Sequence, residues 1–374
     1  VLCLCAWWVH GRCQGRDLAR VGPVFIMSAG ACILSVWTQG EQLQTAGDSA
    51  PERIVTAGIA VWFYLGKLIW PHPLMAIYPG WSVGAGQVIA YLPVLAVMII
   101  LAVLWIRRER WSRGAFFALA YFLVALLPVL GLVDMSFLHY APVADHFQYL
   151  ASMAPLALAG AGLAQLIHFI LPKKIWIQSG LYAGLLLILG IWSWQRIWVY
   201  QTEETLWADA VAKNPNCWLG RNNLGGVFYA QGQVDRAMAQ FQKAVDINPN
   251  YAEARNNLAN CLLSQGQVDE ALVQFQKASE LHPDDATVHR GLGRALAQKG
   301  EVPQAIEQFQ KVLAIDPNDT EAHKNLGDLL FREGRMAEAA EQYEEALSND
   351  PHYANYRKNV EEQESPGQSA PAKN

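Results

Sequence analysis

Hydrophobic residues follow two different patterns along this chain. Before residue 200 they form long runs with few charges, whereas from Trp218 to Tyr353 they alternate with polar residues at a fixed period. An α-helix needs roughly 20 apolar residues to cross a bilayer, so the runs predict membrane-spanning helices. The predicted spans are Val21–Trp37, Ile54–Trp70, Val88–Ile106, Ala115–Val133, Leu150–Leu171 and Ile175–Trp194. The first two are shorter and the second contains Lys67, which leaves open whether both cross.

The second pattern has a period of 34 residues and contains no insertion. Six positions of each unit keep their residue type: a leucine (Leu224, Leu258, Leu292, Leu326), a small residue (Gly225, Ala259, Gly293, Gly327), a glycine (Gly232, Gly266, Gly300, Gly334), an alanine (Ala237, Ala271, Ala305, Ala339), an aromatic residue (Phe241, Phe275, Phe309, Tyr343) and a proline (Pro249, Pro283, Pro317, Pro351). This pattern resembles tetratricopeptide repeats. The resemblance implies helix pairs stacked into a superhelix whose concave groove is suited to binding rather than to chemistry.

Each recurring residue type has a physical reason. The small residue lies on the first helix of a unit and lets the second helix approach closely. The glycine makes the tight turn between the two helices. The proline follows the second helix and stops it, because proline has no amide hydrogen to continue the helical hydrogen bonds. One unit alone cannot cover its apolar face, so neighbouring units must stack.

The predicted fold is therefore all-α, a polytopic transmembrane region followed by an α-solenoid. Trp207, Ala210 and Pro215 lie 34 residues before the matching positions of the first repeat, which predicts a half-repeat cap joined directly to the last span. The predicted parts are a transmembrane region at 1–200, the cap at 201–217, four repeats at 218–251, 252–285, 286–319 and 320–353, and a capping helix start with a disordered tail at 354–374.

Charge separates the same two parts. Residues 1–200 carry 12 Lys+Arg and 7 Asp+Glu, whereas the repeats from Trp218 to Tyr353 carry 12 Lys+Arg and 20 Asp+Glu. Phosphate binding needs a basic surface, so the acidic repeats argue against a nucleic-acid partner. The six cysteines have neither metal-ligand spacing nor a disulfide framework, and we predict no metal and no cofactor. Because the chain begins with Val1 inside an apolar run, we interpret it as a fragment whose N-terminal part is missing.

Basic residues predict the orientation of the spans. Four arginines between Arg107 and Arg113 fill one loop, and Lys173 and Lys174 fill another two spans later. Basic loops favour the cytoplasmic side, so the repeats are expected on the other face, periplasmic or lumenal, of an inner or endoplasmic-reticulum-type membrane. Arginines between residues 12 and 20 conflict with this assignment unless one upstream segment does not cross.

Two segments beside the predicted spans contain polar residues, Leu65–Trp81 with its three prolines and the loop Asp134–Tyr149. Ionisable residues this close to a bilayer tend to face a cavity in the protein. The candidate residues are Lys67, His72, Asp145, His146 and Tyr149. The alternative is an interfacial belt, in which aromatic residues and histidines lie among lipid headgroups, the lysine extends to the membrane surface and the aspartate caps the next helix.

The stretches KLIWPHPLMAIYP, beginning at Lys67, and ADHFQYLAS at Ala144–Ser152, together with the span that runs into the repeats, resemble membrane protein O-mannosyltransferase-like proteins with C-terminal tetratricopeptide repeats. The resemblance implies a polyprenyl-phosphate sugar as donor substrate, with the candidate residues beside the spans lining the cavity for its phosphate. This chain has His146 where many relatives have arginine. The family's catalytic acidic loop would lie before Val1, so we assign no catalytic residue.

Asparagines recur on the first helices of the repeats. One row is Asn223, Asn257, Asn325 and Asn359, interrupted by Gly291, and a second row is Asn222 and Asn256. A carboxamide both donates and accepts hydrogen bonds, so such a row can hold the backbone of an extended peptide whatever its sequence. The rows resemble the asparagine ladder of nucleocytoplasmic O-GlcNAc transferase repeats. The alternative is that asparagine is simply common at these positions.

Two functions follow from these patterns. The first is a fragment of a membrane glycosyltransferase that transfers a sugar, with mannose implied by the resemblance, from the lipid donor to an acceptor protein held by the repeats. The second is a non-enzymatic, membrane-anchored repeat scaffold for client proteins. Both place the chain in a lipid bilayer and give the repeats a protein partner.

Overall fold

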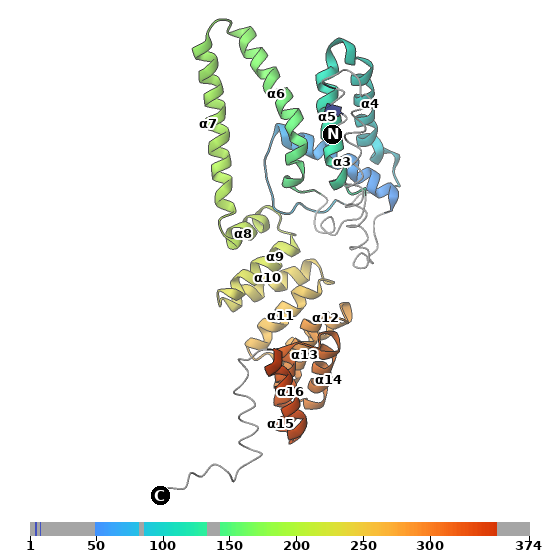
Figure 1. Ribbon diagram of the computed structural model, residues 1–374, viewed down its shortest axis with the longest axis vertical. Coiled ribbons are helices and arrows are strands. Elements are labelled where there is room, and N and C mark those ends of the chain that lie inside the picture. Colours follow the sequence, from blue (N-terminus) through green and yellow to red (C-terminus); the bar gives the residue numbers. More distant parts are fainter. Residues whose placement is uncertain (1–3, 6–7, 9–48, 82–85, 133–142, 350–374) are drawn as a thin grey trace. The chain divides into compact units, whose positions relative to one another are not determined.

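The computed structural model describes residues 4–5, 8, 49–81, 86–132 and 143–349, and every regular element within these ranges is a helix (Figure 1). The chain divides into two compact units, Val1–Cys217 and Trp218–Asn374. The predicted all-α fold is confirmed for these described residues. The predicted span Val21–Trp37 and the segment 354–374 lie outside the described residues.

The described part of the first unit contains six longer α-helices and four shorter helical turns. The α-helices are α3 (Ala50–Ile69), α4 (Leu92–Ile106), α5 (Arg113–Leu126), α6 (Tyr149–Ile170), α7 (Ile175–Val199) and α8 (Glu203–Lys213). The turns are η1 (Val88–Tyr91), η2 (Arg108–Ser112), η3 (Leu127–Val129) and η5 (Asp145–Gln148). Tyr64, Phe122 and Leu126 are fully buried at the centre of the core that joins α3 to α5.

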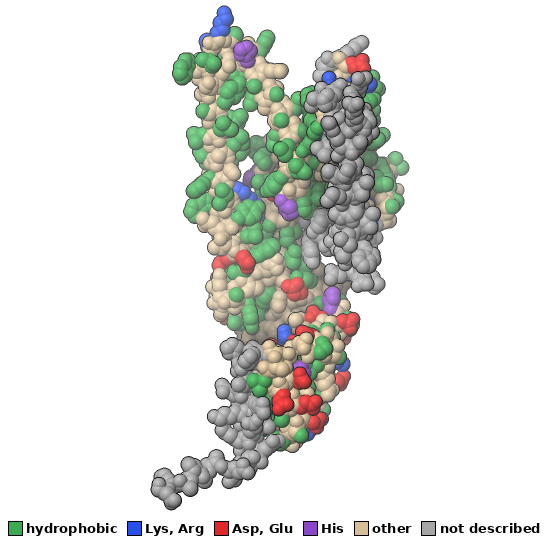
Figure 2. All heavy atoms as spheres, in the orientation of Figure 1, with side chains coloured by type: hydrophobic (Ala, Val, Ile, Leu, Met, Phe, Trp, Pro, Cys, Tyr) green, Lys and Arg blue, Asp and Glu red, His purple; other side chains and the backbone are tan. Residues whose placement is uncertain are grey.

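Three helices of the described residues are long and apolar enough to cross a membrane: Val88–Ile106, Asp145–Ile170 and Ile175–Val199. Figure 2 shows many hydrophobic side chains on the visible faces of α6 and α7. α3 is not among these candidates, and it carries Glu52 and Arg53 as well as Lys67.

The predicted span Ala115–Val133 needs a correction. The structure has an apolar helix at Arg113–Val129, which is shorter than the three candidate spans. Its last turn is the 3-10 segment η3, which contains Pro128, and Gly131 follows with a positive φ of 77°. Proline removes a backbone donor, and a left-handed residue turns the chain out of the helix. The helix therefore stops before the apolar run in the sequence does.

The described part of the second unit consists of eight helices packed as successive antiparallel pairs. They are α9 (Trp218–Ala230), α10 (Val234–Ile247), α11 (Ala252–Ser264), α12 (Val268–Leu281), α13 (Ala286–Lys299), α14 (Val302–Ile315), α15 (Thr320–Arg332) and α16 (Met336–Asn349). Each pair turns at a glycine with positive φ, as the sequence predicts (Gly232, Gly266, Gly300 and Gly334).

Close helix packing in the first, third and fourth repeats depends on an aromatic ring that lies against a glycine. A β-carbon added at Gly225 would lie 2.7 Å from the ring of Phe241, and one at Gly327 would lie 2.6 Å from the ring of Tyr343. Such distances are shorter than van der Waals contact, so only glycine fits without a shift of the ring. The predicted role of the small residue is confirmed at these positions.

A second recurring contact joins each repeat to the one before it. Arg255 on α11 donates to the carbonyl oxygen of Pro249 at 2.8 Å and to Gln274 Oε1 at 2.8 Å. His289, one period later, bonds to the carbonyl oxygen of Pro283 at 2.7 Å and to Gln308 Oε1 at 2.8 Å. His323 repeats the arrangement with the equivalent proline and glutamine. A donor at this position thus satisfies the carbonyl at the end of the preceding repeat.

Candidate functional site

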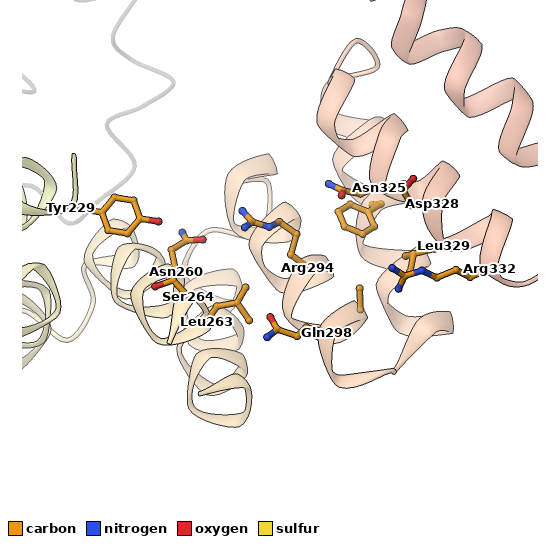
Figure 3. Close-up of a pocket in the computed structure, with 12 residues that line it drawn as sticks. Tyr229, Asn260, Leu263, Ser264, Arg294, Gln298, Asn325, Asp328, Leu329 and Arg332 are labelled. Carbon is orange, nitrogen blue, oxygen red and sulfur yellow. The ribbon is translucent and has the colours of Figure 1, made fainter. Parts of the chain in front are cut away.

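The first candidate site is a pocket of about 330 Å³ that runs across the first helices of the four repeats. Tyr229 comes from α9, Asn260 from α11, Arg294 from α13, and Asp328 and Arg332 from α15 (Figure 3). Because the first helices of stacked repeats line the same face, at least one side chain from each reaches the pocket. Its apolar lining is Leu263, Ala297, Phe309 and Leu329.

The 34-residue period places chemically different residues side by side in this pocket. Asn260, Arg294 and Asp328 occupy one position of successive repeats. Ser264, Gln298 and Arg332 occupy another. These residues are not found by a search for repeat positions that keep the same residue type. The signal that could have found them is variation in side-chain chemistry within an otherwise regular repeat.

The charged side chains of the pocket differ in the partners that they have. Arg294 is half exposed and comes no closer than 4.0 Å to Glu321. Among the described residues, Arg332 has neither a hydrogen bond nor an ion pair, and its side chain is exposed. Asp328 accepts a hydrogen bond of 2.8 Å from the hydroxyl of Tyr343. The pocket therefore presents two arginines and one aspartate that already has a donor.

Two of the predicted groove asparagines bond to each other. Asn222 is 2% exposed, and its Nδ2 donates to Glu253 at 2.9 Å and to the hydroxyl of Tyr251 at 3.3 Å. Its Oδ1 accepts from Asn257 Nδ2 at 3.0 Å. Both polar side-chain atoms of Asn222 are thus engaged in hydrogen bonds that join α9 to α11.

The other predicted asparagines have different environments. Asn325 lines the pocket, and its Nδ2 is buried without a partner among the described residues. Asn256 has a buried Oδ1 without a partner there, and Asn223 is half-buried. Asn359 lies outside the described residues. Among the described members of the set, Asn325 alone belongs to the pocket.

The interruption of the asparagine row at Gly291 has a steric cause. A β-carbon at Gly291 would lie 2.3 Å from the ring of Phe275. Phe275 is fully buried, and Ala259 stands on α11 where the other three repeats have glycine. The ring of Phe275 lies against Gly291 of the next repeat. An asparagine at 291 would require this buried ring to move.

The second candidate site is a polar cluster of the first unit, formed by Asp145 and the segment Pro71–Trp81. Asp145 Oδ1 accepts from the hydroxyl of Tyr78 at 2.6 Å, and Oδ2 accepts from the backbone amide of Met75 at 3.1 Å. Asp145 is 8% exposed, so its charge is satisfied by donors rather than by water. Burial raises the pKa of Tyr78, and the hydrogen bond to Asp145 raises it further, which keeps the phenol protonated as a donor.

Lys67 points into the same cluster. Its ammonium donates to the carbonyl oxygen of Pro73 and lies 5.4 Å and 5.2 Å from the ring centres of Phe63 and Tyr78. Aromatic faces attract a cation at this range. Lys67 and Asp145 therefore both hold the Pro71–Trp81 segment in place.

The remaining predicted phosphate-cavity residues lie at the surface. His72 and His146 are exposed, and Tyr149 is 67% exposed. His146 contacts the neighbouring ring of Phe147, with 4.3 Å between the ring centres. The structure thus brings together Lys67 and Asp145, which are distant in sequence, while the other three candidates are accessible to a ligand.

Sequence reasoning missed an ion-pair network that ties α7 and α8 to this cluster. Asp209 accepts from Arg196 at 3.0 Å and from Lys213 at 2.7 Å. Lys213 also donates to the carbonyl oxygen of Leu74 at 2.9 Å, next to the amide that binds Asp145. No signal in the sequence could connect Lys213 to Leu74, because no repeat or motif relates them.

Comparison with known proteins identifies the second unit. A sequence model of the tetratricopeptide repeat matches residues 228–295, 264–326 and 296–358. The chain contains tetratricopeptide repeats. Repeats of this kind indicate a protein-interaction scaffold with protein partners.

Solved structures of other repeat proteins resemble part of the chain. A tetratricopeptide-repeat protein of Thermus thermophilus is 24% identical, over 47% of this chain and 95% of its own, with a TM-score of 0.37. MamA of Desulfovibrio magneticus is 22% identical over 42% and 91%, with a TM-score of 0.38. YrrB, described as having an unusual peptide-binding site, is 23% identical over 44% and 85%, with a TM-score of 0.38. No curated protein matches the chain.

Proposed function

We propose that this chain is a membrane-anchored scaffold whose repeats hold an extended segment of a client protein. The observation that carries the proposal is the pocket across α9, α11, α13 and α15, lined by polar side chains over an apolar floor. An extended backbone needs donors and acceptors at intervals along its length. The pocket offers them from four first helices of successive repeats.

The helices of the first unit are the proposed anchor. Three of those that the structure describes are long and apolar enough to cross a membrane, and the basic loops at Arg107–Arg113 and Lys173–Lys174 favour one common face. The repeats would then face the periplasm or a lumen, where they would meet secreted or envelope clients.

The proposal is tested by filling the pocket without disturbing the core. Ser264 lines the pocket and is exposed, so Ser264→Trp should fold and obstruct the groove. We expect full chain in lipid nanodiscs to bind fluorescent unfolded peptides, measured by anisotropy, and Ser264→Trp to weaken binding at least about tenfold, which corresponds to about 1.4 kcal/mol. Gln276→Trp, exposed on α12 and outside the pocket, is the control. Equal binding by all three proteins would exclude the groove.

A second candidate function is transfer of a sugar from a polyprenyl-phosphate donor, mannose by the resemblance, to the client. What favours it is the placement of His146 and Tyr149, both exposed, beside buried Asp145 at one end of a candidate span. A lipid phosphate at that end could accept hydrogen bonds from an imidazole N–H and a phenol. His72 on the Pro71–Trp81 segment is a further donor.

Photocrosslinking tests this candidate at the donor-binding step. A photoreactive polyprenyl phosphate should label peptides containing residues 143–153 in membranes that carry the chain, and His146→Ala with Tyr149→Phe should reduce the labelling. Unlabelled polyprenyl phosphate should compete, whereas the matching polyprenyl alcohol should not. Equal competition by the alcohol would mean that no phosphate is recognised and would leave the scaffold as the function.

A further inference from the structure

The repeat pocket has a charge opposite to that of the domain around it. Residues 218–353 carry 12 Lys+Arg and 20 Asp+Glu. Within the pocket, however, the ionisable side chains that carry charge at neutral pH are Arg294, Arg332 and Asp328. Since Asp328 already accepts a hydrogen bond from Tyr343, a ligand entering the pocket meets two guanidinium groups with spare donors.

The two arginines differ from the other arginines on the first helices of the repeats. Arg255 uses its donors on Pro249 and Gln274, and Arg290 pairs with Asp319 at 2.6 Å. These bonds hold the repeats together. Arg332 makes no hydrogen bond or ion pair within the described residues, and Arg294 has a single acidic neighbour at 4.0 Å. Their positions therefore add little to the fold that the structure shows.

A guanidinium group that has no carboxylate partner can still form a two-point hydrogen-bonded pair with one. Figure 3 shows Arg294 between Asn260 on α11 and Asn325 on α15. Both asparagines line the pocket, and a carboxamide both donates and accepts hydrogen bonds, which suits a peptide backbone. Tyr229, 45% exposed at the α9 end of the pocket, would cover an apolar side chain of the same segment.

We propose that the groove selects extended client segments that carry aspartate or glutamate side chains, which pair with Arg294 and Arg332. This inference rests on the proposed client-binding function and names the chemistry of the client. The acidic remainder of the repeats repels acidic segments from the rest of the domain, which confines their binding to these two cations. Asn325 and Asn260 then hold the backbone, and Tyr229 contributes apolar contact.

The test compares peptides that differ in charge alone. Full chain in nanodiscs of neutral lipid is titrated with fluorescent peptides containing Asp and Glu and with matched peptides containing Asn and Gln. All peptides are amidated at the C-terminus, so that only side-chain carboxylates can contribute. We expect the acidic peptides to bind roughly tenfold more tightly, about 1.4 kcal/mol, and the difference to shrink as salt rises.

Substitutions show which residues cause the preference for acidic peptides. Arg294→Gln and Arg332→Gln should each reduce the preference for acidic peptides and leave the affinity for neutral peptides unchanged. Lys277→Gln, exposed on α12 and outside the pocket, removes the same charge and should change nothing. Arg332→Glu should favour peptides in which the acidic residues are replaced by lysine. Circular dichroism of each variant verifies that it folds.

The outcomes separate the two proposals. Neutral and acidic peptides that bind equally, with Ser264→Trp blocking both, would overturn acidic selection and leave client binding intact. If Lys277→Gln reduces the preference for acidic peptides as much as Arg332→Gln does, the preference comes from the net charge of the protein and not from the pocket. This result would also overturn the inference. Failure of every peptide to bind would remove both proposals.

Discussion

Glycines on the first helices of the repeats leave room for an aromatic ring and so set how closely the helices pack. Gly225, Gly293 and Gly327 each receive an aromatic ring of their own repeat. In the second repeat Ala259 takes the place of the glycine, and the ring of Phe275 lies within 2.3 Å of where a side chain on Gly291 would begin. The sequence shows Gly291 as a gap in a polar row, whereas the structure shows that it provides space for a core side chain.

This difference predicts opposite effects for two glycine substitutions. Gly291→Ala should destabilise the repeats by about 1–3 kcal/mol, because the added methyl group overlaps the buried ring of Phe275. Gly226→Ala should stabilise them by about 0.5–1 kcal/mol, because Gly226 lies in α9 with open space around its β-position and alanine restricts the unfolded chain.

Hydrogen exchange of the backbone amides of α9 and α13 is measured in the full chain in nanodiscs at increasing urea concentration. The urea concentration at which half of the protection is lost is then compared between variants. Equal midpoints for Gly291→Ala and the wild type would show that the Phe275 ring moves aside freely.

At the scale of helices, each repeat after the first is fastened to its predecessor by one donor on its first helix. Arginine fills that place in the second repeat and histidine in the third and fourth, with the equivalent proline carbonyl and glutamine as partners. Two residue types with different shapes thus make the same contact, because each places one nitrogen at the proline carbonyl and another at the glutamine side-chain amide. A search for identical residues cannot recognise this contact.

The effect of a His289 substitution on stability should therefore depend on whether the new side chain can form the same hydrogen bonds, and not on its size. His289→Arg should leave stability within about 0.5 kcal/mol, since Arg255 makes the same two bonds in the preceding repeat. His289→Leu should cost about 1–3 kcal/mol, because it leaves the carbonyl of Pro283 and the amide of Gln308 without their partner.

Thermal unfolding of the variants, followed by circular dichroism, provides the measurement, with the exposed His282→Leu as control. A larger loss for the arginine variant than for the leucine variant would contradict the donor argument.

At the scale of the whole molecule, an apolar helical unit and an acidic repeat unit are joined in one chain. The helices α7 and α8 of the first unit are fixed to the Pro71–Trp81 segment through Asp209, Lys213 and the carbonyl of Leu74. The side proposed for the repeats depends on the orientation of α7, which the basic residues around Lys173 favour.

Reporter fusions test that orientation. Alkaline phosphatase fused after Asn349 in bacterial membranes should be active, and green fluorescent protein at the same place should be dark, because the first folds outside the cytoplasm and the second inside. When the chain is instead truncated in the loop at Lys173 and fused there, the phosphatase should be inactive and the green fluorescent protein should fluoresce. A fluorescent fusion after Asn349 would place the repeats in the cytoplasm and remove extracytoplasmic clients.

The sequence alone predicted the helix pairs, their turn glycines and the close approach of helices at Gly225 and Gly327, because these contacts join residues within one 34-residue unit and recur in register. It also predicted an apolar helix beginning near Ala115, but only the structure placed the end of that helix at Pro128 and Gly131.

The tertiary structure decided which side chains meet across long separations. Asp145 bonds to Tyr78, 67 positions away, and Arg294 reaches a pocket shared with residues of α9, α11 and α15. Such contacts depend on how helices pack in space, and the alternation of apolar and polar residues specifies which face of a helix is buried but not which polar groups will face one another.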